Sequence, residues 1–317
     1  MRIVVLDGFT SNPGDLSWES LESLGDLKIW PRTSDDELIE RSLNADILVV
    51  NKRTLRKKDL EQLPKVKCIC TLATGYNNID IDVTKKRGIT VCNAVGYSSL
   101  SVAQHVIAMI LHHYNSMNKY FEDVRSGKWS QSADFTFYSY PLTELAGKNI
   151  GIYGYGKIGQ TVAQICRSLG MNILVISRGK EKDIDNNAQY LSENQFLNQS
   201  DIITLHTPLS ASNLEYMNAD RIAQMKQSAI LLNTGRGGLI NEEDLRVALE
   251  NRKIAAAYLD VLSEEPPSSN HILLTTPRCF ITPHIAWATG ASRRRLIDIV
   301  ADNIRAFQNG RPQNIVN

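Results

Sequence analysis

Short apolar runs rich in valine and isoleucine alternate with amphipathic stretches along this sequence. In the first part of the chain, runs that predict buried strands lie at 2–6, 28–30, 46–50, 66–72 and 89–93. Ser34, followed three residues later by Glu37, forms the capping-box pattern that opens a helix. Gly88 stands where a further helix would end. The pattern therefore predicts a first α/β unit of about 98 residues.

The stretch from 99 to 129 is longer and more apolar, and it predicts one long connecting helix. Gly127 ends the run, and the apolar residues that recur at helical spacing before it are Val102, Val106, Met109, Ile110 and Met117. Its full hydrophobic coverage indicates that this helix is buried against another surface.

A second alternation follows, with apolar runs at 148–154, 171–177, 201–206, 228–235, 253–261 and 279–283. Helical stretches separate these runs, and the segment 288–310 has the pattern of one long final helix. Strands that are apolar nearly throughout are typical of parallel sheets covered by helices on both faces. The chain is therefore predicted to be an α/β protein built on doubly wound parallel sheets.

The composition is that of an ordinary globular protein, and it excludes several classes of function. The 317 residues suggest about two domains, with 43% hydrophobic and 22% charged residues. A net charge of +1 with scattered basic residues gives no electrostatic argument for nucleic-acid binding. No apolar stretch is long enough to span a membrane, and the N-terminal run is too short for a signal peptide.

The five cysteines, an odd number, indicate reduced thiols in a cytoplasmic protein. Cys68 and Cys70 alternate within an apolar run, which is typical of a strand. No second pair of Cys or His stands at ligand spacing, so we expect no metal site.

Three glycines, Gly154, Gly156 and Gly159, follow a buried-strand pattern and open a helical one in the order G-x-G-x-x-G. The first makes a tight turn, the second admits a pyrophosphate to the backbone, and the third lets helix pack on strand. The helix start then offers free amides to the phosphates. The context favours dinucleotide binding over a purely structural strand-to-helix turn.

The end of the next strand bears on the choice of cofactor. An acid that holds the ribose hydroxyls is expected about 20 residues on, but Ser177 stands there, followed by Arg178. Without the carboxylate, a 2′-phosphate meets no repulsion, and Arg178 could pair with it. The sequence therefore favours NADP(H) and leaves NAD(H) open, because chance basic residues in a variable loop would look the same.

Charged side chains follow three later strands: Arg236, then Asp260 with Glu265, then His284. An Arg can hold a substrate carboxylate and polarise its carbonyl, and a His can donate a proton to the carbonyl oxygen as hydride arrives. A carboxylate orients the imidazole and stabilises its positive charge. Singly, each has a structural explanation, as a helix-capping ion pair, a solvated loop residue or a packed histidine.

These segments together resemble the D-isomer-specific 2-hydroxyacid dehydrogenases over essentially the whole chain. The matching stretches are "LATGYNNIDI", "NAVGYSSLSVAQH", "ELAGKNIGIYGYGKIG", "LHTPLS", "LLNTGRGGLINEEDL", "AAYLDVLSEEPP" and "TPHIAWAT". Within the family, "LDGFTSNPGDLSWE" and "PHIAW" look closer to glycerate dehydrogenases (hydroxypyruvate reductases) than to phosphoglycerate dehydrogenases. Two residues depart from the common pattern: Ser177 replaces the usual acid, and Gln104 stands where many members carry Glu.

The resemblance assigns roles to individual residues. It implies Arg236, Glu265 and His284 as catalytic residues. It implies that the substrate carboxylate meets the backbone amides of Ala73, Thr74, Gly75 and Tyr76. For the cofactor, it places the Lys157 and Ile158 amides at the pyrophosphate, His206, Thr207 and Pro208 at the adenosine side, and Thr234 and Asp260 at the nicotinamide, with Asp260 accepting from its carboxamide.

The resemblance also implies the organisation of the chain. It predicts two Rossmann-like domains, with the dinucleotide-binding domain, residues 99–286, inserted in a split substrate-binding domain, residues 1–98 plus 287–317. The helix from Ser99 and the following loop resemble the segment through which such enzymes form homodimers. That loop carries Phe135, Phe137, Tyr138 and Tyr140, which suits an interface and would equally suit a lid or core loop.

The predicted function is NAD(P)H-dependent reduction of a small 2-keto acid, hydroxypyruvate or glyoxylate, to the D-2-hydroxy acid, with His284 as proton donor. One alternative is a broader, D-lactate-like D-2-hydroxyacid dehydrogenase. A more remote alternative is a non-enzymatic NAD(H) sensor resembling a corepressor, against which the lack of a tail or basic arm weighs.

Overall fold

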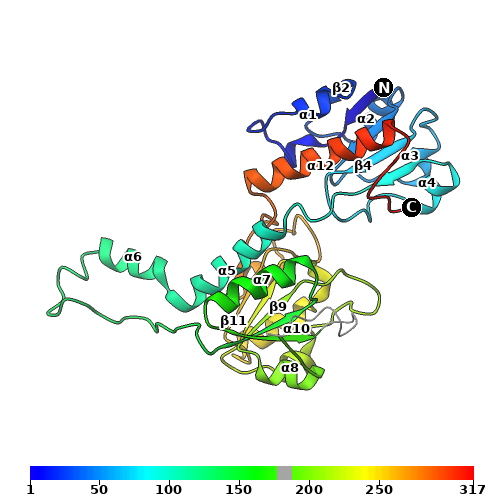
Figure 1. Cartoon of the computed structure of the whole chain (residues 1–317). Coiled ribbons are helices and arrows are strands. Elements are labelled where there is room, and N and C mark those ends of the chain that lie inside the picture. Colours follow the sequence, from blue (N-terminus) through cyan, green and yellow to red (C-terminus); the bar gives the residue numbers. More distant parts are fainter. Residues whose placement is uncertain (177–187) are drawn as a thin grey trace. The chain divides into compact units, whose positions relative to one another are not determined.

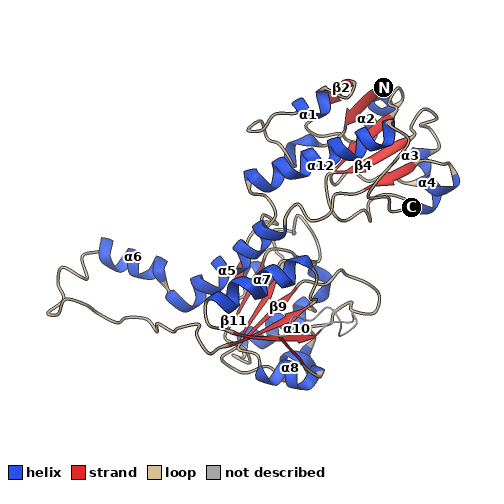
Figure 2. Ribbon diagram, in the orientation of Figure 1, coloured by secondary structure: helices blue, strands red, loops and turns tan. Residues whose placement is uncertain are grey.

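The computed structural model describes residues 1–176 and 188–317. The chain divides into two compact units, one made of Met1–Ser98 with Trp287–Asn317 and the other of Ser99–Ala286. Each unit holds one parallel β-sheet with helices on both faces (Figures 1 and 2). The predicted fold class, α/β with two Rossmann-like doubly wound parallel sheets, is confirmed.

The first unit is built on a five-stranded sheet in the order β2-β1-β3-β4-β5. All neighbouring strands in it run parallel. The strands are β1 (Arg2–Val5), β2 (Asp26–Ile29), β3 (Ile47–Val50), β4 (Cys68–Thr71) and β5 (Thr90–Cys92). The three central strands are almost completely buried, which explains their continuous apolar runs.

Helices cover both faces of this first sheet and complete two apolar cores. One core includes side chains of the short α1 (Glu19–Glu22) and the long α12 (Gly290–Gln308). The other includes side chains of α2 (Asp35–Ser42), α3 (Lys57–Leu60) and α4 (Ile81–Lys86). The capping box predicted at Ser34 and Glu37 is present at the start of α2.

The second unit is built on a seven-stranded parallel sheet in the order β12-β11-β10-β9-β6-β7-β8. Its strands are β6 (Asn149–Tyr153), β7 (Asn172–Ile176), β8 (Ala188–Tyr190), β9 (Ile202–Leu205), β10 (Ile230–Asn233), β11 (Ala256–Leu259) and β12 (Cys279–Ile281). Because all pairs are parallel, the carboxyl ends of β9, β6 and β10 to β12 meet at one edge.

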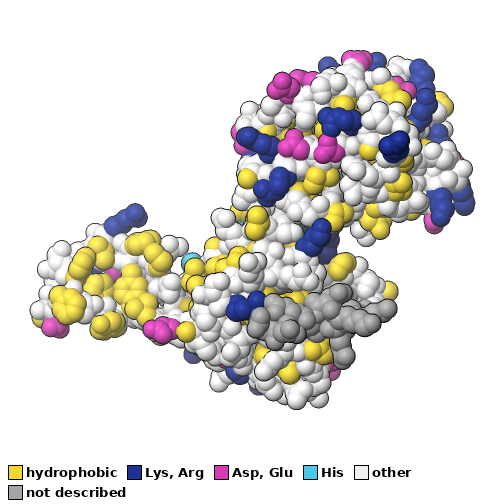
Figure 3. Space-filling view, viewed as in Figure 1, with side chains coloured by type: hydrophobic (Ala, Val, Ile, Leu, Met, Phe, Trp, Pro, Cys, Tyr) yellow, Lys and Arg dark blue, Asp and Glu magenta, His cyan; other side chains and the backbone are white. Residues whose placement is uncertain are grey.

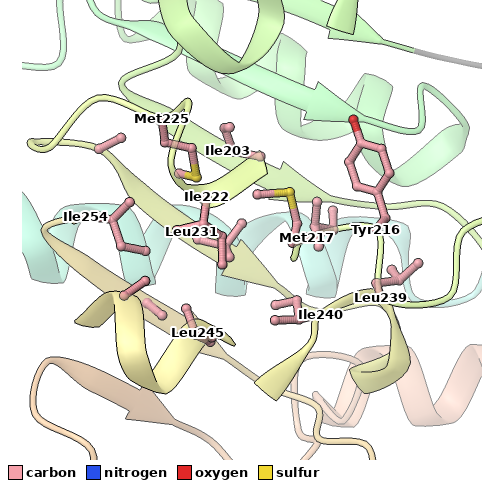
Figure 4. Close-up of a cluster of buried hydrophobic side chains, with 14 of the residues drawn as sticks. Ile203, Tyr216, Met217, Ile222, Met225, Leu231, Leu239, Ile240, Leu245 and Ile254 are labelled. Carbon is pink, nitrogen blue, oxygen red and sulfur yellow. The ribbon is translucent and has the colours of Figure 1, made fainter. Parts of the chain in front are cut away.

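Helices of the second unit also pack on both faces of its sheet. One core includes α5 (Ser99–Asn115) and α7 (Lys157–Ser168). The opposite core includes the helices α8 (Glu193–Gln199), α9 (Ala219–Ile222), α10 (Glu242–Glu250) and α11 (Ile272–Thr275). Figure 4 shows this second core, where Ile203 and Leu231 from the sheet lie among Ile222, Met225 and Leu245.

The single long helix predicted over 99–129 is wrong. Ser116 adopts a left-handed conformation (φ 49°, ψ 28°) and separates α5 from α6 (Met117–Arg125). Met117, placed by its spacing in the buried stripe, is 52% exposed, and α6 buries no residue at all. Apolar spacing continued across the break because the α6 side chains form an exposed apolar surface instead of a core.

Two further observations bear on the predictions. The edge strand β8 was not predicted, since its short, half-exposed sequence lacks an apolar run. Within the described ranges, no helix has the length and apolar character needed to cross a bilayer.

Candidate active site at the carboxyl edge of the second sheet

The turn after β6 requires glycine at two of its three motif positions. Gly154 has φ +100°, and a Cβ there would lie 2.8 Å from the backbone of His206. A Cβ on Gly159 would lie 2.3 Å from the carbonyl oxygen of Gly154. The β6–α7 turn therefore packs against the β9 end without room for side chains, as a dinucleotide-binding turn requires.

The third glycine leaves open space at the start of α7. Gly156 is the N-cap in an extended conformation, and apart from its chain neighbours no atom of the described residues lies within 4 Å of the position that its Cβ would occupy. Gly156 has no side chain to cap this helix, and the first-turn amides of Lys157 and Ile158 have no hydrogen-bond partner among the described residues. Free amides, a positive helix end and a vacant approach fit the pyrophosphate of a dinucleotide.

Two of the other expected cofactor residues follow β9 and β10. The His206 ring contacts Thr204, with 2.9 Å between Nε2 and Oγ1, and burial lowers the pKa of His206 to about 4. The ring is therefore neutral near neutral pH. Thr234 has a buried Oγ1 that hydrogen-bonds to no described residue. Buried hydroxyls are normally paired, so this one fits a polar ligand group such as that of a nicotinamide cofactor.

The remaining cofactor predictions stand as follows. Thr207 and Pro208 continue the segment after β9, where the carbonyl of Pro208 accepts from Asn213 (2.8 Å). Ser177 and Arg178, on which the preference for NADP(H) was based, lie outside the described residues.

Arg236 lies exposed just past β10, on a turn that a buried side chain holds through hydrogen bonds. The buried Asn233 accepts from the Gly235 amide (3.0 Å) and donates to the Arg236 carbonyl (2.8 Å). Gly237 admits no side chain, because a Cβ would lie 1.9 Å from the carbonyl carbon of Leu262. Across residues 1–176 and 188–317, no carboxylate pairs with Arg236, whose Nη1 donates only to the neighbouring Gly235 carbonyl (2.7 Å). Its guanidinium is thus available to an anionic ligand.

Glu265 and His284 come from the ends of the next two strands and meet directly. Oε2 of Glu265 lies 2.6 Å from Nδ1 of His284, and Oε1 accepts from the Leu262 amide at 3.1 Å. Both side chains remain about one-quarter to one-third exposed, at 31% and 26%. Nε2 of His284 has no hydrogen-bond partner among the described residues, so this nitrogen is free to exchange a proton with a ligand.

The carboxylate of Asp260 forms a different set of hydrogen bonds, which join it to the segment that follows β12. Its Oδ1 accepts from the Thr282 hydroxyl (2.6 Å) and the Ile285 amide (2.9 Å), and its Oδ2 accepts from the Ala286 amide (2.8 Å). These bonds flank His284, whose φ of +54° lies in the left-handed region. Such a backbone costs about 1–2 kcal/mol in a residue other than glycine, so the surrounding bonds must hold it.

The four residues expected to meet a substrate carboxylate lie in the first unit, just after β4. Neighbouring groups bind their carbonyls: Ala94 donates to the Ala73 carbonyl (3.0 Å) and Asn93 to that of Thr74 (2.7 Å). Their own amides, from Ala73 to Tyr76, have no acceptor among the described residues. Consecutive free amides form the concave, positively polarised backbone that binds anions.

One cluster of possible metal ligands exists in the described part of the chain, and the sequence pattern did not reveal it. The thiols of Cys68, Cys70 and Cys92 lie within 4.8 Å of one another and are buried. The register of β4 and β5 places Cys70 opposite Cys92, a contact between distant segments. Three thiols are one short of the four ligands of a structural zinc site, and apolar side chains surround them.

Sequence reasoning also missed residues that support the site without touching a ligand. Asn233 fixes the Arg236 turn, and Thr282 joins Asp260 to the His284 segment. Their common signal is a polar residue in or just after an otherwise apolar strand, such as "ILLN" at 230–233. A polar side chain that is buried at a strand end needs partners, and the loop beyond the strand supplies them.

Comparison with known proteins identifies related sequences over the full chain. Residues 107–286 match the family model described as D-isomer specific 2-hydroxyacid dehydrogenase, NAD binding domain. A hydroxypyruvate reductase of Blautia hydrogenotrophica is 43% identical, covering 100% of both chains. A glycerate dehydrogenase of Methylorubrum extorquens is 37% identical over 89% of this chain and 88% of its own.

Solved structures resemble the fold over the same length. The crystal structure of a D-lactate dehydrogenase with NAD+ from Lactobacillus jensenii has a TM-score of 0.83 and 28% identity, and the match covers 100% of both chains. Sequence and structure therefore agree on the class of protein to which this chain is similar.

Proposed function

We propose, from the premise that this chain belongs to the D-isomer-specific 2-hydroxyacid dehydrogenase family, that it reduces hydroxypyruvate or glyoxylate to the D-2-hydroxy acid. Family membership makes the chain an oxidoreductase that uses a nicotinamide cofactor and acts on small keto and hydroxy acids. The identity to a hydroxypyruvate reductase, 43% over both full lengths, supports the narrower substrate.

The observation that carries the proposal is the hydrogen-bonded pair of His284 and Glu265. The two residues follow β12 and β11, and Arg236 follows the neighbouring strand β10. Glu265 binds Nδ1 at 2.6 Å, which leaves Nε2 facing no described partner. In the proposed reaction, Nε2 of His284 donates its proton to the keto oxygen, and Glu265 stabilises the imidazolium before this transfer. The guanidinium of Arg236, which pairs with no described carboxylate, holds the substrate carboxylate and polarises the carbonyl.

The cofactor supplies hydride to the keto carbon when it is bound. The residues that we assign to it are Gly154, Gly156, Lys157, Ile158 and Gly159 at the pyrophosphate, His206, Thr207 and Pro208 at the adenosine side, and Thr234 and Asp260 at the nicotinamide. We also assign the amides of Ala73, Thr74, Gly75 and Tyr76 to the substrate carboxylate. The free amides support the pyrophosphate and substrate-carboxylate assignments, and the orphaned hydroxyl supports that of Thr234. The two units would accordingly be a substrate-binding unit, 1–98 with 287–317, and a dinucleotide-binding unit, 99–286.

We propose NADP(H) as the preferred cofactor, with NAD(H) as the alternative. The support comes from the sequence: Ser177 stands where an acid would repel a 2′-phosphate, and Arg178 follows it. The reduced state of all five cysteines supports a cytoplasmic location.

Initial rates of NADPH and NADH oxidation with hydroxypyruvate, glyoxylate, pyruvate and phenylpyruvate test the function. We expect the highest kcat/KM with hydroxypyruvate or glyoxylate, and with NADPH. Activity confined to pyruvate and phenylpyruvate would instead establish the broader D-lactate-like dehydrogenase. Tight NADH binding without turnover of any keto acid would establish the sensor. His284→Asn should abolish most turnover and leave cofactor affinity unchanged, because the ring acts on the keto oxygen.

We further propose that the chain is a homodimer through α6 and the loop that follows it. This arm exposes large apolar side chains, with Phe135 at 89%, Tyr138 at 78% and Phe121 at 50%. They border a groove of about 390 Å³, and Figure 3 shows the apolar atoms gathered along the arm. Exposed aromatic patches of this kind typically mark protein–protein interfaces, which supports a second copy over a lid.

Light scattering tests the dimer directly. The wild-type protein is expected at twice the chain mass of 35.5 kDa, and Phe135→Glu with Tyr138→Glu is expected at the chain mass. Val247→Glu is the matched control, since Val247 of α10 is 43% exposed and lies away from the arm in sequence. A monomeric wild-type protein would refute the proposal.

A further inference from the structure

We propose that His105 of α5 is a positioning residue for the reaction proposed above. Through the Thr282 hydroxyl it orients Asp260, whose carboxylate accepts the hydrogen bonds that fix the segment around His284. The inference rests on the proposed function, and it adds a residue to which no role has been given so far. The His105 ring lies beside two side chains, those of Thr282 and Asp260. Nε2 of His105 lies 3.0 Å from the Thr282 hydroxyl and 3.7 Å from Oδ1 of Asp260.

The direction of each hydrogen bond follows from counting protons. A threonine hydroxyl carries one proton, and Thr282 donates it to Oδ1 of Asp260 at 2.6 Å. Its oxygen can therefore only accept from His105, so Nε2 of His105 must carry a hydrogen. The result is a directed chain, from imidazole N–H to hydroxyl to carboxylate, that ends on a fully buried side chain.

This chain holds the backbone on both sides of His284. Asp260 receives the amides of Ile285 and Ala286, and Thr282 stands two residues before His284. A second bond from the same helix reaches this segment, since the Ser101 hydroxyl donates to the Ala286 carbonyl at 2.7 Å. The first turns of α5 are thus hydrogen-bonded to residues 282–286 at two points, Thr282 and Ala286. His284, which lies between these two residues, has a left-handed φ of +54°.

Without the His105 donor, the Thr282 hydroxyl is free to turn away, and Asp260 loses the group that orients it. The segment would then relax its left-handed residue, and the imidazole would move from the position that proton donation needs. A misplacement of about 1 Å costs about a hundredfold in rate, so the effect falls on kcat. Arg236, which is proposed to bind the substrate carboxylate, stands on a separate turn. The KM for the keto acid is therefore expected to stay within about twofold of the wild-type value.

Three variants test this role, with steady-state kinetics and amide hydrogen exchange as the readouts. His105→Leu removes the donor, and His105→Gln restores an N–H near the position of Nε2. His112→Leu is the matched control on the same helix, because His112 is exposed and takes part in none of these bonds. We expect His105→Leu to lower kcat about tenfold to a hundredfold and to speed exchange over 282–286. His105→Gln should recover most of both, and His112→Leu should change neither.

The outcomes separate this inference from the proposed function. If the wild-type protein reduces no keto acid, the proposed function fails, and the exchange measurement still decides whether His105 holds the segment. Unchanged kcat and exchange in His105→Leu would overturn the inference. Equal loss in His105→Leu and His105→Gln would also overturn it, because a packing role would not distinguish a restored donor.

Discussion

Replacing His206 by Gln is expected to make the second unit less sensitive to acid. Burial lowers the pKa of this ring to about 4, whereas an unfolded chain gives histidine a pKa of about 6.5. The unfolded state therefore takes up a proton between these two values while the folded state does not. Stability that is fully present above about pH 6.5 is lost progressively as the pH falls toward 4.

The size of the effect follows from the distance between the two pKa values. At 1.36 kcal/mol for each pH unit, a gap from about 6.5 to about 4 corresponds to roughly 3 kcal/mol. About 2 kcal/mol of this is already lost at pH 5, since the unfolded state is then almost fully protonated. Glutamine does not titrate, and its amide can replace Nε2 in the contact with the Thr204 hydroxyl.

Urea unfolding at about pH 7 and about pH 5 measures the difference. The wild-type protein should lose about 2 kcal/mol more than His206→Gln between these conditions. His112→Gln is the control for replacing any histidine, because His112 is exposed on α5. Equal acid sensitivity in wild-type protein and His206→Gln would refute the idea that this ring is buried in its neutral form.

Three further changes have effects that follow from single contacts. Arg236→Ala should lower kcat/KM for the keto acid about 10²–10³-fold in the same rate assay, and an unchanged value would contradict its assignment. Gly237→Ala should destabilise the protein by about 3 kcal/mol in a urea titration, since its Cβ would overlap the Leu262 carbonyl. Gly238→Ala, which meets only flexible leucine side chains, should be tolerated. Burial opposes ionisation of Asp201, but the Asn149 amide and Lys226 outweigh it and lower its pKa. The stability from Asp201 is therefore present above its unfolded pKa and lost as the pH falls through the folded one, so Asp201→Asn should flatten the acid limb of stability below about pH 4.

The parallel sheets could be predicted because their strands are buried on both faces. Runs such as those of β3 and β10 are apolar at nearly every position, and only a strand covered on both sides produces that pattern. The glycine turn could equally be predicted, because a Cβ at Gly154 or Gly159 would lie 2.3–2.8 Å from backbone atoms and no other residue fits. In both cases, distant segments impose the requirement, and it leaves a pattern within a short stretch of sequence.

Other features left no such pattern in the local sequence. The break at Ser116 is invisible, because α6 continues the apolar spacing of α5 on an exposed surface. The meeting of Cys70 with Cys92 depends on the register of two strands. The bond from His105 to Thr282 joins residues 177 positions apart, and neither stands out in its own segment.

Two of the carboxylates after β11, Asp260 and Glu265, show how the fold divides roles that the residue types leave open. Asp260 and Glu265 stand five residues apart, and either could orient His284 by its chemistry alone. Asp260 lies at the buried strand end, where its oxygens accept from one hydroxyl and two backbone amides. Those bonds make it a support for the segment, whereas Glu265, farther along the loop and 31% exposed, reaches the ring itself. The oxygens of Asp260 already accept from backbone amides and are not available to the imidazole. Glu265, the more exposed of the two, is therefore the carboxylate suited to stabilise the imidazolium.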